Sequence, residues 1–130
     1  MLRIAVAVCL LFSMTLVVCA QGRNGSWLNG KWEGKGFQID TDGTWTMRLR
    51  TQGRKFLIEY PSLNCGGEWR LISINSRRAR FREKITVGLS ECVDKGNVLI
   101  ERLNGRQIAY RYSYRGTTDV SASAILIRKR

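Results

Sequence analysis

Short segments of alternating apolar and polar residues, separated by turn signals, constrain this chain more than any other feature. From Asn29 onward the turn signals recur about every ten residues, the spacing expected of an antiparallel sandwich or barrel. They are Asp42-Gly43, Gln52-Gly53, Asn75-Ser76, Asn104-Gly105 and Arg115-Gly116. The pattern predicts an all-β chain with strands near 31–39, 43–51, 54–60, 67–74, 77–86, 97–103, 106–114 and 119–128.

One apolar face per strand and tight hairpins favour a small, closed, up-and-down antiparallel barrel of eight strands, because closure leaves no strand edge exposed. A chain of 130 residues supports one such domain. The side chains expected to face inward are Trp45, Met47, Leu49, Phe56, Ile58, Tyr60, Trp69, Leu71, Ala79, Phe81, Ile85, Ile108, Tyr110, Tyr112, Tyr114, Val120, Ala122, Ala124 and Leu126. Small residues of the last strand opposite aromatic residues of the preceding one would let the barrel fill its own interior.

The first twenty residues have the pattern of an export signal. Arg3 supplies a positive charge, an apolar run extends from Ile4 to Val18, and Val18-Cys19-Ala20 offers small residues at a cleavage site. We expect cleavage after Ala20, an extension over 21–29 and a barrel domain over 30–130. The alternatives are a retained anchor, for which the run is short, and a lipidated Cys19. The mature protein is expected to be a monomer without a membrane span, periplasmic or secreted.

Removal of the signal leaves two cysteines, Cys65 and Cys92. In an oxidising compartment they most simply form one disulfide, which contributes roughly 3–4 kcal/mol in the chain-entropy account. A catalytic thiol is the alternative, but the chain contains no His that would activate it.

One acidic residue breaks the alternation. Glu83 falls on the same face of its strand as Phe81 and Ile85, so a carboxylate is expected inside the barrel. A buried carboxylate is costly without a partner. The candidate partners are Tyr110, Tyr112 and Arg102. A polar link in the barrel floor is the commoner role of such a group, and contact with a ligand is the alternative.

The start of the first strand resembles a known family. Gly30-Lys31-Trp32 is similar to the Gly-x-Trp start of lipocalins and other calycin barrels. In that family the Trp closes one barrel end beneath an Arg from the last strand, and Arg128 stands at a matching place. The resemblance implies a calycin-like barrel. The chain is shorter than a typical lipocalin, so its cavity should be small.

A more specific resemblance covers residues 30–115. The segment Tyr60-Pro-Ser-Leu-Asn-Cys-Gly-Gly67 looks like the Tyr-Pro-Ser-Leu-x-Cys-Gly-Gly motif of a small bacterial exported domain, which also occurs as the extracellular part of some bacterial Ser/Thr protein kinases. Phe81-Arg-Glu-Lys-Ile-Thr-Val-Gly88 and Cys92-Val-Asp-Lys-Gly96 are similar to two further segments of that domain. The match implies that Cys65 and Cys92 pair and that Glu83 is a family feature. It implies no particular activity.

Charge is the strongest functional signal in the sequence. The chain has 22 Lys and Arg against 10 Asp and Glu, and Arg suits bidentate contact with carboxylate, phosphate or sulfate. The residues expected to form a basic face are Arg78, Arg80, Arg82 and Lys84 on one strand, extended by Arg48 and Arg50. Such a field favours an anionic polymer as partner. A basic surface that serves only solubility is the alternative.

Several other classes of function are disfavoured. Without His, the chain lacks His-based acid–base catalysis, Ser-His-Asp triads and His-ligated zinc. Hydrolysis by paired carboxylates needs two converging acids, and Glu33 and Glu101 fall on the outer phase of their strands. Asp40-Thr41-Asp42-Gly43 resembles the start of a calcium loop, but Thr51 occupies the position of the bidentate Glu, so a hairpin turn is expected.

Two hypotheses of non-catalytic binding remain, with no cofactor or metal expected. In the first, the barrel mouth binds a small apolar or amphipathic ligand through Trp32, Trp45, Tyr60, Trp69, Glu83 and Tyr112. In the second, the basic face binds an anionic envelope polymer or an acidic protein, for example as an inhibitor. Nucleic acid is disfavoured as a partner, because the aromatic side chains face inward and are not free to stack on bases.

Overall fold

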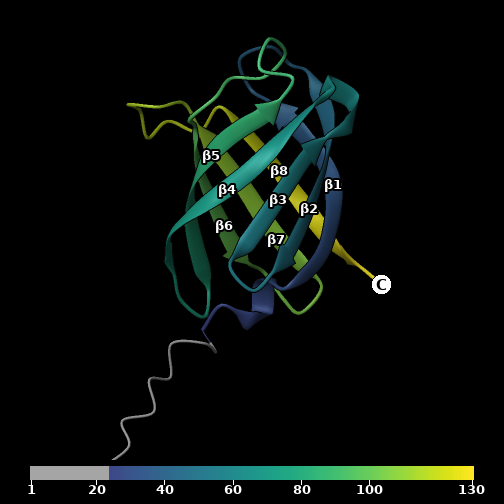
Figure 1. Ribbon diagram of the computed structural model, residues 1–130, viewed down its shortest axis with the longest axis vertical. Coiled ribbons are helices and arrows are strands. Elements are labelled where there is room, and N and C mark those ends of the chain that lie inside the picture. Colours follow the sequence, from purple (N-terminus) through teal and green to yellow (C-terminus); the bar gives the residue numbers. More distant parts are fainter. Residues whose placement is uncertain (1–23) are drawn as a thin grey trace, which may run out of the picture.

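A computed structural model describes residues 24–130, so the expected signal peptide lies outside the described residues. In the described part, eight strands form a closed barrel in which sequence neighbours pair antiparallel and β1 pairs with β8 (Figure 1). The strands are β1 (Gly30–Gln38), β2 (Thr44–Gln52), β3 (Lys55–Tyr60), β4 (Cys65–Ile74), β5 (Arg78–Val87), β6 (Asn97–Arg102), β7 (Gln107–Ser113) and β8 (Ala122–Lys129). The predicted all-β, up-and-down barrel is confirmed.

Inward-facing apolar side chains alternate with outward-facing polar ones, as expected for strands with one buried face. On β2, Trp45, Met47 and Leu49 are buried, while Arg48 and Arg50 are exposed. The buried apolar side chains of all eight strands, together with two residues that precede β1, form one hydrophobic cluster. The barrel interior is therefore mostly a packed core rather than a channel.

The eighth strand differs from its prediction. Strand β8 begins at Ala122 rather than at 119, and Val120 is 40% exposed, so the inward orientation predicted for Val120 is wrong. The chain joins β7 only at Ser121, whose amide donates to the carbonyl of Tyr112 at 2.9 Å. Residues before that point belong to a loop and do not follow the strand alternation.

Two other expected inward residues are only partly buried. Leu71 packs against the core from a place where the β4–β5 register shifts between Leu71 and Ser73. Tyr114 lies just beyond the end of β7 and also packs against the core from its edge. The register shift explains the partial burial of Leu71, and the position of Tyr114 beyond the end of its strand explains that of Tyr114.

One end of the barrel is closed by a short 3-10 helix, η1 (Ser26–Leu28), which lies at the lower end in Figure 1. Leu28 is fully buried and Trp27 nearly so, so these residues belong to the barrel domain although the sequence placed them in an extension over 21–29. The Trp27 indole donates to the carbonyl of Asn75 at 2.8 Å, and Thr51 donates through its hydroxyl to the carbonyl of Leu28.

The expected Trp–Arg closure is present at this end. Trp32 is 1% exposed and donates to the carbonyl of Leu28 at 2.9 Å, and the Arg128 guanidinium lies 4.2 Å from the centre of the Trp32 ring. Arg128 also donates to the carbonyls of Trp27 at 2.7 Å, Gly105 at 3.2 Å and Asn29. The Arg128 side chain thus connects β8 to η1 and to the hairpin between β6 and β7. We name this region the closed end.

The opposite end, called the mouth below, is formed by the loops over 39–43, 61–64, 88–96 and 114–121, at the top of Figure 1. Pro61 is the first residue of the 3-10 helix η2 (Pro61–Leu63). Strand β3 ends at the preceding residue, because the fixed φ angle of proline does not suit a continuing strand. The Cys65–Cys92 disulfide, with Cα atoms 6.3 Å apart and a sequence separation of 27, ties the 88–96 loop to β4. The predicted disulfide is confirmed. No helix of the described part is long and apolar enough to cross a membrane.

Candidate functional site

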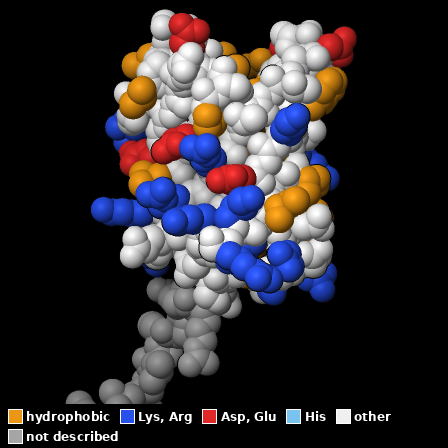
Figure 2. Space-filling model, turned by 90° about the vertical axis from the view of Figure 1, so that its right-hand side faces the viewer, with side chains coloured by type: hydrophobic (Ala, Val, Ile, Leu, Met, Phe, Trp, Pro, Cys, Tyr) orange, Lys and Arg blue, Asp and Glu red, His pale blue; other side chains and the backbone are white. Residues whose placement is uncertain are grey.

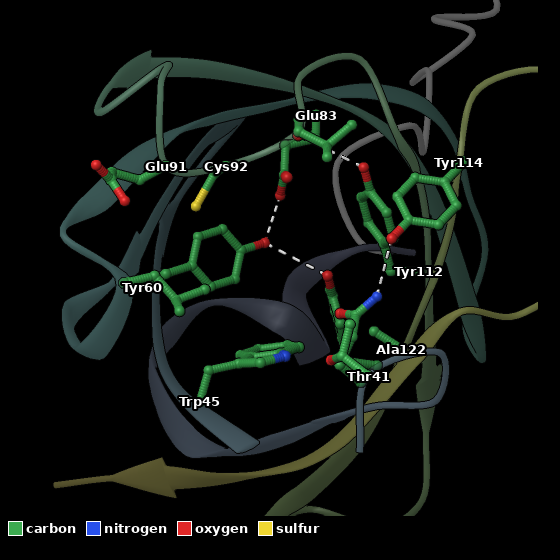
Figure 3. Close-up of a pocket in the computed structure, with 13 residues that line it drawn as sticks. Thr41, Trp45, Tyr60, Glu83, Glu91, Cys92, Tyr112, Tyr114 and Ala122 are labelled. Atoms are coloured by element: carbon green, nitrogen blue, oxygen red, sulfur yellow. Dashed lines mark hydrogen bonds between the residues drawn. The ribbon is translucent and has the colours of Figure 1, made fainter. Parts of the chain in front are cut away.

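A cavity of about 200 Å³ opens at the mouth of the barrel. Its wall comes from strands β1, β2, β3, β5, β7 and β8 and from all four mouth loops, over 39–43, 61–64, 88–96 and 114–121. The lining residues are Gln38, Thr41, Trp45, Tyr60, Leu63, Glu83, Glu91, Cys92, Val93, Tyr110, Tyr112, Tyr114 and Ala122. Figure 3 shows Trp45, Tyr60, Glu83, Tyr112 and Tyr114 around this space.

Aromatic rings form most of the cavity wall. Trp45 meets Tyr60 and Tyr110 edge to face, with ring centres 5.4 and 5.8 Å apart. Tyr112 and Tyr114 form a second edge-to-face pair at 5.6 Å. Edge-to-face contacts fix the orientation of each ring. The cavity therefore has a rigid aromatic wall, with the small side chain of Ala122 between the two groups.

Gly36 allows this arrangement on β1. A Cβ at Gly36 would overlap the ring of Trp45, so only glycine lets the indole lie across the strand. Gly96 has the same relation to the ring of Tyr112. These two glycines set the positions of rings on opposite sides of the cavity.

Glu83 lies at the inner end of the cavity and is 3% exposed, as the sequence pattern predicted. Its Oε2 atom accepts hydrogen bonds from the Tyr60 hydroxyl and from the Trp69 indole, the latter at 2.8 Å. The Tyr110 hydroxyl lies 3.4 Å from the Tyr60 hydroxyl. Because Tyr60 uses its own proton to donate to Glu83, Tyr110 is the donor in this second hydrogen bond. The expected partners Tyr110, Tyr112 and Arg102 are thus replaced by Tyr60 and Trp69.

The two Glu83 oxygens differ in their surroundings. Oε1 makes no hydrogen bond with any residue of the 24–130 range. Within that range no fully buried polar side-chain atom lacks a partner, so Oε1 is not fully enclosed, and Glu83 is one of the residues that line the mouth cavity. One oxygen of the buried carboxylate is held by the barrel, and the other is available from the mouth.

The surroundings shift the proton affinity of these groups. Burial raises the pKa of the Glu83 carboxyl above its usual value, although the hydrogen bonds from Tyr60 and Trp69 oppose the shift. Burial also raises the pKa values of the Tyr60 and Tyr110 hydroxyls well above the usual value, and that of Tyr112 to a lesser degree. These tyrosines are neutral hydrogen-bonding groups at neutral pH.

The 88–96 loop is fixed beside the cavity by several bonds besides the disulfide. Asp94 accepts through Oδ1 from the amides of Ile85 and Lys95, both at 2.8 Å. The amide of Glu83 donates to the carbonyl of Gly96 at 2.9 Å. The position of Glu83 in the cavity is therefore coupled to the loop that forms one side of the mouth.

A second polar group stands at the opposite side of the mouth. Gln38 donates to Asp40 at 2.8 Å and to the Tyr114 hydroxyl at 3.0 Å, and Tyr114 donates to the second oxygen of Asp40 at 3.0 Å. The hydrogen bond from Gln38 is the main cause that lowers the pKa of Asp40. The 39–43 segment is a hairpin loop, as expected, and the carboxylate of Asp40 serves to hold Tyr114 in place.

Four of the six predicted ligand-binding residues line this cavity, namely Trp45, Tyr60, Glu83 and Tyr112. Trp69 reaches Glu83 from below the cavity, with its ring stacked at 5.8 Å on that of Tyr110. Trp32 lies at the closed end, so its assignment to the mouth site is corrected: the strand alternation shows which side of the sheet a residue faces but not which end of the barrel it occupies. Tyr110 and Tyr114 also line the cavity and were not among the predicted ligand-binding residues, although their alternation with Tyr112 was the available signal.

The predicted basic face is divided by the closed barrel. Arg78, Arg80, Arg82 and Lys84 lie along the outside of β5, but β3 and β4 separate them from Arg48 and Arg50 on β2. Arg48 also lies between Glu33, at 3.7 Å, and Glu59, at 3.9 Å. Arg48 and Arg50 therefore do not extend the β5 row. Instead a depression beside β5 is lined by Arg70, Arg82, Lys84, Lys95 and Arg115, together with Glu83 and Asp94.

The fold and the mouth cavity define the general class: a small closed antiparallel barrel with an aromatic pocket at one end. Comparison with solved structures supports the fold. A redesigned beta barrel, mFAP1, bound to DFHBI superimposes with a TM-score of 0.61 at 14% identity, over 82% of this chain and 99% of that one. The barrel EF1p2_mFAP2b bound to DFHBI gives a TM-score of 0.60 at 16% identity, over 83% and 98%. No family model and no curated protein matches the sequence.

Proposed function

We propose that this protein is a non-catalytic, exported binding protein that holds a small apolar or amphipathic ligand in the mouth of its barrel. The observation that carries the proposal is the cavity of about 200 Å³ with a rigid aromatic wall and one polar group, Glu83, at its inner end. Apolar walls with a few placed polar groups are typical of small-molecule sites.

The cavity volume limits the ligand. It exceeds the roughly 150 Å³ of an engineered cavity that binds benzene, and is below the roughly 300 Å³ at which sites for drug-sized molecules begin. A ligand with one ring or a short branched chain fits this range. The two similar barrels are each bound to a small molecule, DFHBI, which supports use of the fold in this way.

Binding rather than catalysis is favoured by the composition of the cavity wall. Among the thirteen described lining residues there is no His, Lys, Arg or free thiol that could act together with Glu83. Export is favoured by the disulfide, which is stable in an oxidising compartment, together with the signal pattern and the sequence resemblance to an exported bacterial domain.

A second candidate function rests on the depression beside β5. Five cationic residues, Arg70, Arg82, Lys84, Lys95 and Arg115, line it together with Asp94 and with Glu83, whose carboxylate lies inside the barrel. Such a surface favours an anionic envelope polymer or an acidic protein. Ionic strength separates the two functions, since contacts between exposed charges weaken as salt rises, whereas contacts inside a cavity change little.

The test is native mass spectrometry of the protein purified from its own compartment, at low and high salt. We expect a small adduct of defined mass that persists at high salt. Ala122→Phe, which fills the cavity, should abolish this adduct, while Ala109→Phe on the neighbouring strand β7 should retain it. A protein without an adduct, or anionic adducts lost at high salt, would contradict the proposal and favour the surface beside β5.

A further inference from the structure

The charges around the cavity are the reverse of those on the rest of the molecule. None of the thirteen described residues that line it is Lys or Arg, and two of them, Glu83 and Glu91, are acidic. The whole chain, in contrast, has 22 basic and 10 acidic residues. In so basic a protein, a cavity bounded only by acidic charges requires an explanation.

The same polarity extends to the loops of the mouth. The four mouth loops carry five acidic side chains, Asp40, Asp42, Glu91, Asp94 and Asp119, against Lys95 and Arg115. The three hairpin turns at the closed end carry only basic ones, Arg54, Arg77 and Arg106. Figure 2 shows one face of the molecule, with acidic side chains at its upper, loop end and others beside basic ones in the middle, and with mostly basic side chains over the lower half. At physiological salt, charges are screened beyond about 8 Å, so a ligand in the mouth experiences mainly the acidic loops.

The carboxylate at the inner end of the cavity has a partner for only one of its two oxygens unless a ligand binds. Glu83 is buried and its Oε2 atom has two donors, while Oε1 has none among the described residues. An ionised carboxylate in such a place is costly unless it is paired. No cation of the described chain forms a salt bridge with it.

The rings around Glu83 favour the same kind of partner. The faces of Trp and Tyr rings carry partial negative charge and attract a cation placed within about 6 Å. Trp45, Tyr60, Tyr110, Tyr112 and Tyr114 contribute five such rings to the wall. A metal ion is a poor fit, because calcium requires about six to eight oxygen ligands and the lining is mostly ring carbon.

We propose that the ligand of this cavity is a small organic cation, an amine or alkylated ammonium, whose charge is bound by Glu83 and the aromatic rings. This inference rests on the proposed ligand-binding function and specifies its chemistry. An anion would be repelled by Glu83 and Glu91, and a neutral apolar ligand would cover Oε1 without giving it a partner.

The test uses two pairs of compounds with nearly equal shape and different charge. The first pair is choline and 3,3-dimethylbutan-1-ol, and the second is benzylammonium and benzyl alcohol. Binding is measured by titration of the mature protein at pH 7.5, followed through the indole N–H signals in the NMR spectrum. The signals of Trp45 and Trp69 should shift, while those of Trp27 and Trp32 at the closed end serve as internal controls.

We expect at least one cation to bind tenfold or more tightly than its neutral counterpart. Glu83→Gln should remove this preference and Glu91→Gln should reduce it a few-fold. The matched control is Glu59→Gln, which removes a negative charge from a side chain that is 64% exposed on the outside of the barrel. This control should retain the preference.

The outcomes separate the two proposals. If the neutral compounds bind as tightly as the cations, the ligand-binding function stands and the inference about charge is overturned. If the preference survives Glu83→Gln together with Glu91→Gln, it does not arise at this site and the inference is again overturned. If none of the four compounds shifts the Trp45 and Trp69 signals, the inference about charge is overturned, while the ligand-binding function is decided by the adduct that native mass spectrometry detects.

Discussion

Replacement of Glu83 by Gln and by Leu separates the charge of this carboxylate from its role as a hydrogen-bond acceptor. Leu leaves the buried donors of Tyr60 and Trp69 without their shared acceptor, and each such loss costs about 1–3 kcal/mol. We therefore expect Glu83→Leu to lower the free energy of unfolding by about 2–5 kcal/mol. Gln keeps an oxygen at the place of Oε2 and turns its amide nitrogen toward the open cavity. Glu83→Gln should stay within about 1 kcal/mol of the original protein at pH 7.

The pH dependence of the unfolding free energy provides an independent measurement. Because burial raises the pKa of Glu83 in the folded state, the folded protein binds the proton more tightly than the unfolded chain. Stability is therefore highest below the unfolded pKa of about 4.3 and falls as the pH rises through the folded pKa, by at most about 1.4 kcal/mol per pH unit. Glu83→Gln has no such group. The difference between the two proteins isolates Glu83, since Asp94 and the neighbouring tyrosines are common to both.

The assay is urea unfolding followed by tryptophan fluorescence, at intervals from pH 4 to pH 8. The original protein should gain stability relative to Glu83→Gln toward the acidic end of this range. Two results would refute the reasoning. A loss for Glu83→Gln equal to that for Glu83→Leu would show that charge, not the acceptor oxygen, holds the two donors. A difference that is constant with pH would show that Glu83 does not titrate as its burial requires.

Three further predictions concern other parts of the barrel. Cys65→Ala together with Cys92→Ala should lower the free energy of unfolding by about 3–4 kcal/mol in urea titrations, and an unchanged midpoint would contradict this. Arg128→Met removes the cation from the ring of Trp32 and three hydrogen bonds at the closed end, which should cost about 2–4 kcal/mol in the same assay, whereas Lys129→Met should cost less than about 1 kcal/mol. Since the pKa values of all four tyrosines are raised on folding, stability should fall as the pH rises above about 10, where the unfolded chain ionises first; absorbance at 295 nm should show less tyrosinate in the folded protein than in guanidinium at equal pH.

The sequence was sufficient to predict the barrel, because each strand is recognised from the pattern of residues that are neighbours in the chain. Period-two alternation with a turn every ten residues or so determines which side chains face inward, and the eight strands have few other ways to bury one face each. The burial of Glu83 followed from its phase between Phe81 and Ile85. The main error, at Val120, falls in a loop, where no strand pairing enforces the alternation.

The tertiary structure alone decided which of these inward residues meet. Alternation does not say at which height along the barrel axis a side chain lies, so Trp32 and Trp45 had the same sequence signal but occupy opposite ends. The partners of Glu83 were likewise decided by the register of β3 and β4 against β5. The sequence determined the net charge of the chain. Only the closure of the barrel gathered the loops that carry Asp40, Asp42, Glu91, Asp94 and Asp119 around a single opening, because closure brings the first and last strands of the sheet together.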